Sequence, residues 1–151
     1  MSKTVWGNAT WYLMHTLSIK LKPEHESKVP ELFNIFSLIC SSLPCPVCQE
    51  HAMQVLRTVD KRRLATKDSL IGIIHQFHNM VNKRIGKPEF SKEEHDALYV
   101  RAKTGPVINN FINVYNQKHG DEKAMLHAWT RLKAIRQLKD FLNKNPDIFF
   151  P

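Results

Sequence analysis

Residues 70–88 of the chain read LIGIIHQFHNMVNKRIGKP. Apolar side chains recur there every three or four residues, at Leu70, Ile74, Phe77, Val81 and Ile85. This is the period of an α-helix that buries one face. We expect the helix to end at residues 86–88, because glycine readily caps a helix and proline cannot continue one. The stretch therefore predicts a long amphipathic helix.

Helical periodicity continues on both sides of this stretch, and no pair of alternating runs indicates a β-hairpin. Ser91 followed by Glu94 is the pattern of an N-terminal capping box, which predicts a helix start there. Further helices are expected over residues 6–20, 32–43, 46–57, 91–103, 107–118 and 122–143. The sequence thus predicts an all-α bundle.

The chain has 151 residues, of which 42% are hydrophobic and 24% are charged. These fractions fit one packed domain and exclude a disordered chain. The apolar runs are too short to cross a bilayer, and residues 1–8 lack the apolar core of a secretory signal. We therefore expect a cytoplasmic protein that spans no membrane. The net charge of +8 suits an anionic ligand, nucleic acid or an acidic partner without choosing among them.

Three cysteines lie close together in the sequence, and two of them form a CxxC motif, Cys45 and Cys48. A helix is predicted to start at Pro46, so both thiols would lie on the first turn, where the helix dipole lowers a thiol pKa. Cys40, on the preceding helix, is expected to be a small buried core residue. In a chain with so few cysteines, the close pair indicates redox or metal chemistry.

The CxxC pair alone leaves other interpretations open. With His51, His75 and His78, the two cysteines could form a structural zinc site in a basic helical module that binds nucleic acid. The long separation of the cysteines from His75 and His78, and the mid-helix position of both histidines, disfavour zinc. A thioredoxin-like oxidoreductase would need strands around the motif, and none is predicted.

Residues 78–88, HNMVNKRIGKP, form a second cluster. His78 and Asn82 lie one helical turn apart, as do Asn79 and Lys83, so two polar rows run beside the apolar face. A solvated helix face explains the basic residues well. It explains the paired asparagines poorly, because asparagine is a weak helix former whose side chain needs a partner.

With the upstream CxxC and an N-terminal WG-x3-W-x3-H, this HNxVNxxxGKP motif resembles the Erv/ALR family of FAD-dependent sulfhydryl oxidases. The N-terminal motif is carried by Trp6, Gly7, Trp11 and His15, and the resemblance extends to Tyr99. The compact form resembles the short members of large DNA viruses. The resemblance implies a four-helix bundle with a short fifth helix that holds FAD over residues 1–103. Residues 104–151 would be a helical extension packed on the same domain or in a dimer interface.

The resemblance also implies site residues. Cys48 would be the cysteine next to the flavin, and Cys45 would exchange disulfides with the substrate; no metal is implied. The other implied FAD contacts are Gly7, Trp11 and His15 beside the flavin, His78, Asn79, Val81 and Asn82 on the adenine and ribose side, Lys83 or Arg84 with Lys87 at the pyrophosphate, and Tyr99, where the family usually has a tryptophan.

Three positions depart from the family pattern. Ile73 replaces a common tryptophan, while His75 and Lys92 replace two cysteines that usually form a structural disulfide. Both halves of that disulfide are absent together, so no orphan thiol is created. His75 could partly replace the missing stacking of the tryptophan.

The implied reaction passes electrons from a substrate dithiol through the CxxC disulfide to FAD and then to O2, giving H2O2. The implied partners are a dithiol protein or a thioredoxin-like CxxC relay protein, together with O2. A second copy of the chain is also implied, as a homodimer. Neither nucleic acid nor a membrane is expected as a partner. Outside the resemblance, Trp129 is expected in the core or an interface, and residues 147–151 look like an exposed apolar tail that docks on a partner. His95, His119 and His127 carry no motif and are expected to be structural or exposed.

Overall fold

The structure, a computed structural model, describes residues 3–117 and 122–151, without the side chains of residues 122–127; His119 and the His127 side chain lie outside this part. Its α-helices are α1 (Lys3–Lys20), α2 (Val29–Cys40), α3 (Pro46–Arg57), α4 (Lys67–Ile85), α5 (Lys92–Val100), α6 (Thr104–Tyr115) and α7 (Glu122–Lys144). Two short 3₁₀ helices, Pro23–Lys28 and Lys61–Arg63, connect some of them. The all-α prediction is confirmed, since the described residues contain only an isolated bridge, Leu21 to Phe149, as β-structure.

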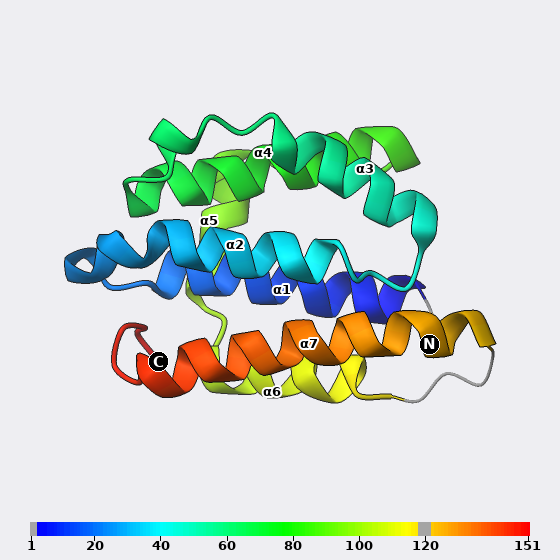
Figure 1. The fold of residues 1–151 in the computed structure, drawn as a ribbon. Helices are drawn as coiled ribbons and strands as arrows, with labels where there is room; N and C mark the ends of the chain where they lie inside the picture. The colour runs from blue at the N-terminus through cyan, green and yellow to red at the C-terminus, as the bar shows by residue number, and fades with distance from the viewer. Residues whose placement is uncertain (1–2, 118–121) are drawn as a thin grey trace.

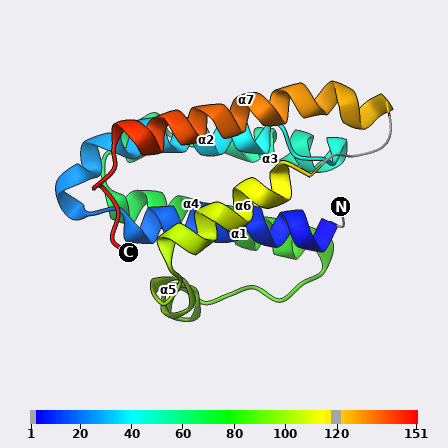
Figure 2. The same ribbon diagram turned by 90° about the horizontal axis from the view of Figure 1, so that it is seen from below.

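Figure 1 shows α3 and α4 on one side of the bundle, α1 and α2 as the middle pair, and α6 and α7 on the other side. The middle pair contacts both outer pairs, because α1 packs on α4 and α6 while α2 packs on α3 and α7 (Figure 2). The short helix α5 closes one side of the bundle against α1. None of the described helices is long and apolar enough to cross a membrane.

Helix α1 lies at the centre of the bundle. Residues 13–18 are all buried, including the polar side chains of His15, Thr16 and Ser18. The Ser18 hydroxyl donates to the Met14 carbonyl at 2.7 Å, so burial of this polar group within the helix is compensated. A helix buried on every side has no single apolar stripe, which is why its period is weaker than that of α4.

The ends of α4 and α5 follow the predicted signals. Gly86 caps α4 in the left-handed region, with φ 76°, where a side chain would be strained. The Ser91 hydroxyl accepts a hydrogen bond from the Glu94 backbone N–H at 3.1 Å and so caps α5. Helix α6 begins at Thr104, earlier than predicted, because Pro106 is accommodated in its first turn.

The C-terminal segment corrects one expectation. Residues 147–151 are not a free tail: the Ile148 side chain is buried and its carbonyl accepts from the Lys22 backbone N–H at 2.8 Å. The Phe150 backbone N–H donates to the Lys20 carbonyl at 2.7 Å, and the Thr104 hydroxyl donates to the Phe150 carbonyl at 2.6 Å. Backbone pairing and burial of Ile148 therefore hold the segment on its own chain.

Helices α6 and α7 add to the same core as the first five helices, through Phe111, Leu138 and Phe141. Trp129 does not join them, since its side chain is 83% exposed. The prediction that Trp129 lies in the core is therefore wrong. The alternative prediction, that Trp129 lies in an interface, stays untested.

Candidate active site

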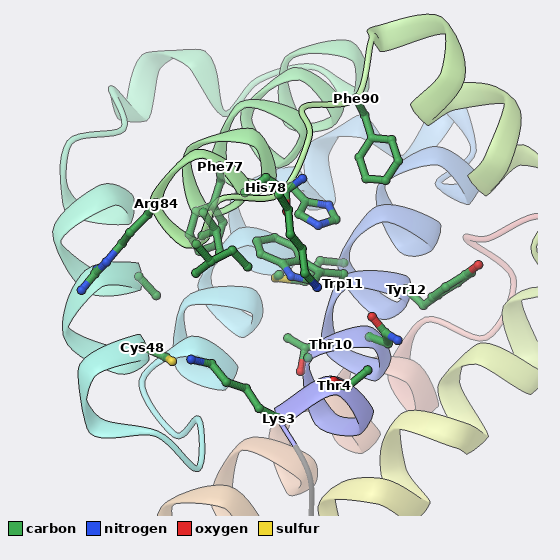
Figure 3. A pocket seen from close by; sticks show the side chains of 18 of the residues that line it. Lys3, Thr4, Thr10, Trp11, Tyr12, Cys48, Phe77, His78, Arg84 and Phe90 are labelled. Atoms are coloured by element: carbon green, nitrogen blue, oxygen red, sulfur yellow. The ribbon is translucent and has the colours of Figure 1, made fainter.

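A cavity of about 770 Å³ opens between α1, α3, α4 and the segment that joins α4 to α5 (Figure 3). Helix α1 contributes Gly7 and Trp11 to its wall, α3 contributes Cys48, and α4 contributes His78 and Asn82. Figure 3 shows Cys48, Lys3 and Arg84 around one end of the cavity and Tyr12 and Phe90 at the other. Residues from all three sequence motifs therefore meet in one place.

A disulfide joins Cys45 and Cys48 at the start of α3. Cys45 is the N-cap residue in an extended conformation, and its sulfur accepts a hydrogen bond from the Cys48 backbone N–H at 3.3 Å. Pro46 occupies the first turn, where its lack of an N–H costs nothing. Cys48 lines the cavity and Cys45 does not, so the two sulfurs face different surroundings.

Aromatic rings form one wall of the cavity. The Trp11 ring of α1 stacks on the His78 ring of α4, with centroids 4.0 Å apart and an interplanar angle of 9°. Phe77 meets Trp11 edge-on at 5.0 Å, and Tyr99 of α5 lines the cavity beside Tyr12. The helix packing of α1 against α4 thus builds a flat, partly apolar wall of the kind that planar ligands prefer.

His15 lies behind this wall rather than in it. Its side chain is 1% exposed, and its Nε2 is 2.8 Å from His78 Nδ1. The other nitrogen, Nδ1, is 2.5 Å from Nε2 of His95 on α5. Burial, reinforced by the neighbouring histidines, holds the pKa of His15 well below its usual range. His15 therefore does not line the cavity itself, but its hydrogen bond joins it to His78, which does.

Burial also lowers the pKa of His78, to about 4, aided by positive charge on His95, His75 and Lys87. Both rings are accordingly neutral at neutral pH. A neutral His78 can stack on a ring and accept or donate a hydrogen bond without bringing a charge into the cavity.

Asn79 and His75 hold the segment before α5 against α4. The Asn79 amide donates to the Phe90 carbonyl at 2.9 Å, and its oxygen accepts from the Phe90 backbone N–H at 2.9 Å. His75 Nε2 lies 3.0 Å from the same carbonyl. Asn79 does not line the cavity, because its side chain is hydrogen-bonded to the backbone of Phe90. Phe90 itself lines the cavity.

The basic residues of the HNxVNxxxGKP motif divide between two surfaces. Arg84 and Lys87 line the cavity, whereas Lys83 is exposed and does not. Successive helix residues point about 100° apart, so only one of Lys83 and Arg84 can face inward. Val81 and Asn82 also line the cavity. Asn82 is 3% exposed, and no described residue hydrogen-bonds its side-chain amide.

Several cavity residues carry no motif. Lys3, Thr10 and Phe90 line it, as do His51 and Cys40. The Cys40 thiol is free and buried, as predicted, and burial raises its pKa to about 12. The spacing of His51 from the CxxC pair indicates that it lies near the cavity. No such spacing points to Lys3, Thr10 or Phe90, which reach the cavity through tertiary packing alone.

The zinc interpretation fails on the same geometry. Cys45 and Cys48 are joined to each other, so neither offers a thiolate to a metal, and His78 is bonded to His15. Within the described part of the chain, no group of three or more metal-binding side chains comes together.

Comparison with known proteins agrees with the motifs. Residues 8–100, more than half of the chain, match the sequence model of the Erv1 / Alr family. The chain is 31% identical over 96 residues to the FAD-linked sulfhydryl oxidase of African swine fever virus (isolate Pig/Kenya/KEN-50/1950), a match that covers 62% of this chain and 79% of the relative. It is 28% identical over 91 residues to the FAD-linked sulfhydryl oxidase ERV1 of Oryza sativa subsp. japonica, covering 60% of this chain and 46% of the relative.

Protein 096R of Invertebrate iridescent virus 3 is 29% identical over 89 residues. That match covers 58% of this chain and 60% of the relative, which is less than two thirds of its length.

Proposed function

This chain belongs to the Erv1/Alr family, and from the site that its matched residues build we propose that it is an FAD-linked sulfhydryl oxidase that forms disulfide bonds. The observation that carries the proposal is the place of the Cys45–Cys48 disulfide, with one sulfur in the wall of a large aromatic cavity. A disulfide in this position can take electrons from a substrate outside and deliver them to an acceptor inside.

The cavity fits FAD on several independent features. Its volume of about 770 Å³ is in the range of small-molecule and cofactor sites. The stacked Trp11 and His78 offer a flat surface to an aromatic ring system. Arg84 and Lys87 suit a pyrophosphate, to which cationic side chains bind strongly.

Two further features indicate that the cavity is built for a ligand. The Asn82 side chain lines the cavity, and its amide has no hydrogen-bond partner among the described residues, so it is available to a ligand. Gly7 also lines the cavity and has no side chain, which leaves room for a ligand beside α1. We assign Trp11, His78, Val81, Asn82, Arg84, Lys87 and Tyr99 to cofactor binding, with Gly7 and Cys48 on the flavin side.

Substrate chemistry begins at Cys45, the sulfur outside the cavity. A substrate thiolate attacks Cys45 Sγ and forms a mixed disulfide, while the Cys45–Cys48 bond breaks and Cys48 leaves as a thiolate. The N-terminus of α3 stabilises that thiolate, because its free N–H groups and dipole favour negative charge. The second substrate thiol then attacks the substrate sulfur of the mixed disulfide, which releases Cys45 and an oxidised substrate.

When bound, FAD supplies a two-electron acceptor for the reduced cysteine pair and a donor of those electrons to O2. The balance of the whole reaction is two thiols and one O2 giving one disulfide and one H2O2. The contribution of the protein is to hold Cys48 against the cavity, to keep Trp11 and His78 stacked, and to place Cys45 where a substrate reaches it.

A direct test compares oxygen consumption with dithiothreitol as the substrate. Cys48→Ser is expected to retain FAD and to lose turnover, because no disulfide forms. Gln54→Ala, an exposed change on the same helix, serves as the matched control and should consume oxygen at the wild-type rate. Undiminished oxygen consumption by Cys48→Ser would overturn the assignment.

The domain division and the partners form part of the same proposal. Residues 1–103 form the oxidase domain, and residues 104–151 extend its core, which is supported by the burial of Phe111 and Leu138. With a single CxxC, the chain takes electrons directly from a dithiol protein or from the CxxC of a relay protein, in the cytoplasm. Trp129 and Leu132, one helical turn apart and 83% and 49% exposed, support a homodimer through α7. Sedimentation should then give a dimer for the native chain and a monomer for Trp129→Ser.

A further inference from the structure

Four side chains from three helices form an unbroken row of hydrogen bonds behind the cavity wall. His78 Nδ1 of α4 is 2.8 Å from His15 Nε2 of α1, and His15 Nδ1 is 2.5 Å from His95 Nε2 of α5. His95 Nδ1 is in turn 2.8 Å from Asp96 Oδ1. One end of the row, His78, lines the cavity (Figure 3), and the other end, Asp96, has a side chain that is 43% exposed.

The carboxylate at the outer end fixes the tautomer of every ring. Asp96 can only accept, so His95 carries its proton on Nδ1 and offers the Nε2 lone pair to His15. His15 must then carry its proton on Nδ1 and accept from His78 at Nε2. His78 consequently carries its proton on Nδ1, and its Nε2 lone pair is the free acceptor at the cavity end. No described residue hydrogen-bonds that nitrogen.

The charges around the row keep it in this state. Burial lowers the pKa of His95 despite its hydrogen bond to Asp96, and the nearby His75 and Lys92 act in the same direction. Although partial burial raises the pKa of Asp96, its hydrogen bonds from Lys92 and His95 outweigh that effect and lower it. Lys92 Nζ lies 2.7 Å from Asp96 Oδ2. Burial is the leading cause of the low pKa of His78. His75 of α4 and Lys87, which follows α4, lower the pKa of His78 further.

We propose that His78, His15, His95 and Asp96 form a proton relay between the cofactor cavity and solvent. The proposal rests on the proposed function, since a thiol oxidase must move protons in each half of its cycle. Oxidation of two thiols releases two protons with two electrons, and reduction of O2 to H2O2 consumes two of each. The relay exports one of those protons in the first half and returns one in the second.

Each transfer along the row is balanced. A proton that binds His78 Nε2 lets the Nδ1 proton pass to His15 Nε2, and the Nδ1 proton of His15 then passes to His95 Nε2. The Nδ1 proton of His95 passes to Asp96 and leaves for solvent, so one proton enters, one leaves and no ring keeps a charge. The reverse transfer restores every tautomer without rotation of a ring. A cycle that sends one proton out and one back therefore resets the relay.

The first test does not depend on turnover. Nitrogen NMR of the FAD-loaded protein, labelled at histidine and assigned with single His→Gln variants, reports which nitrogen of each ring holds the proton. The relay requires the Nδ1–H tautomer at His15, His78 and His95 together. A mixture, with Nδ1–H at one of these histidines and Nε2–H at its neighbour, would break the row and overturn the proposal while leaving the oxidase assignment untouched.

The second test measures proton release during anaerobic reduction by a dithiol, with a pH indicator in a rapid-mixing experiment. Asp96→Asn keeps an oxygen that accepts from His95 but cannot take its proton. We expect release to slow about tenfold, less than the roughly 10²- to 10⁴-fold of a direct acid–base group. Glu93→Gln, an exposed charge-matched change on the same helix, should release protons at the wild-type rate.

Equal release rates for Asp96→Asn and the wild type, with equal FAD content, would overturn the relay. If the protein binds no FAD and oxidises no dithiol, the proposed function fails instead, and the tautomer measurement on the flavin-free chain still decides whether the hydrogen-bonded row exists.

Discussion

The Trp11 ring of α1 lies face to face with the His78 ring of α4, with centroids 4.0 Å apart. This contact joins the N-terminal WG-x3-W-x3-H motif to the HNxVNxxxGKP motif across the bundle. It gives the cavity its flat wall and separates the cavity from the buried His15 behind it. Two motifs that are distant in the sequence are thus parts of a single binding surface.

Replacement of Arg84 tests the charged part of that surface. Arg84→Ala should weaken FAD binding several-fold, because it removes a cationic side chain that lines the cavity and that we propose binds the pyrophosphate. Lys83→Ala removes the same charge from the exposed face of the same helix and should leave FAD binding unchanged. Titration of the flavin-free proteins with FAD, followed by fluorescence, measures both affinities. Equal losses in the two variants would mean that net charge, not position, attracts the cofactor.

The Asn82 amide should contribute one specific hydrogen bond to the cofactor. Asn82→Ala removes a buried amide without a partner among the described residues, so the free protein should lose little stability. FAD affinity should fall about two- to tenfold, since a hydrogen bond contributes roughly 0.5–1.5 kcal/mol. The same titration gives the affinity, and thermal unfolding without FAD gives the stability. An unchanged affinity would remove Asn82 from the site.

Asn79 should act on the cofactor only through the protein. Asn79→Ala breaks both hydrogen bonds to the Phe90 backbone, which should cost about 1–3 kcal/mol in the free energy of unfolding. Gln76→Ala, which replaces an exposed residue one turn earlier on α4, is the control. Its free energy of unfolding should stay close to that of the native chain. Denaturant unfolding of the two variants provides the comparison. A loss of FAD binding in Asn79→Ala without any loss of stability would instead place Asn79 in direct contact with the cofactor.

The buried histidines should make the protein sensitive to acid. The pKa of His78 is lowered to about 4 in the folded protein, chiefly by burial, against 6.5 in the unfolded chain. The unfolded state therefore binds more protons between these values, and the free energy of unfolding must fall as the pH falls from 6.5 towards 4. The shift of His78 corresponds to roughly 3 kcal/mol over that window, with further loss from His15.

Denaturant unfolding across that pH range measures the effect, with FAD removed. His78→Gln keeps a donor for His15 but does not titrate, so its stability should decline less steeply than that of the native chain. His25→Gln should follow the native curve, since His25 lies outside the cluster. Parallel curves for the native chain and His78→Gln would contradict the burial of a neutral His78.

The sequence predicted the helices well where one face alone is buried. In α4 the apolar period and the Gly86 cap gave both the helix and its end. Helix α1 was harder, because residues 13–18 are buried on every side and no stripe reveals which side chain meets the cavity. His15 was consequently expected at the cofactor, although it is separated from the cavity by His78.

Long-range packing set the other limits of prediction. In the sequence, Ile148 looks like part of an exposed tail. Its hydrogen bond from the Lys22 backbone depends on the fold and cannot be read from the sequence. The site residues Lys3 and Phe90 belong to no motif, since only the fold carries them to the cavity. The choice between Lys83 and Arg84 likewise needed the rotation of α4, which spacing alone leaves undetermined.

The most direct measurement is the visible absorption spectrum of the purified protein, recorded before and after anaerobic addition of dithiothreitol and again after admission of air. We expect a flavin spectrum that bleaches with the dithiol and returns with oxygen, while Cys48→Ser shows the spectrum but does not bleach at the native rate. A colourless protein that cannot be reconstituted with FAD would mean that the cavity is not a flavin site.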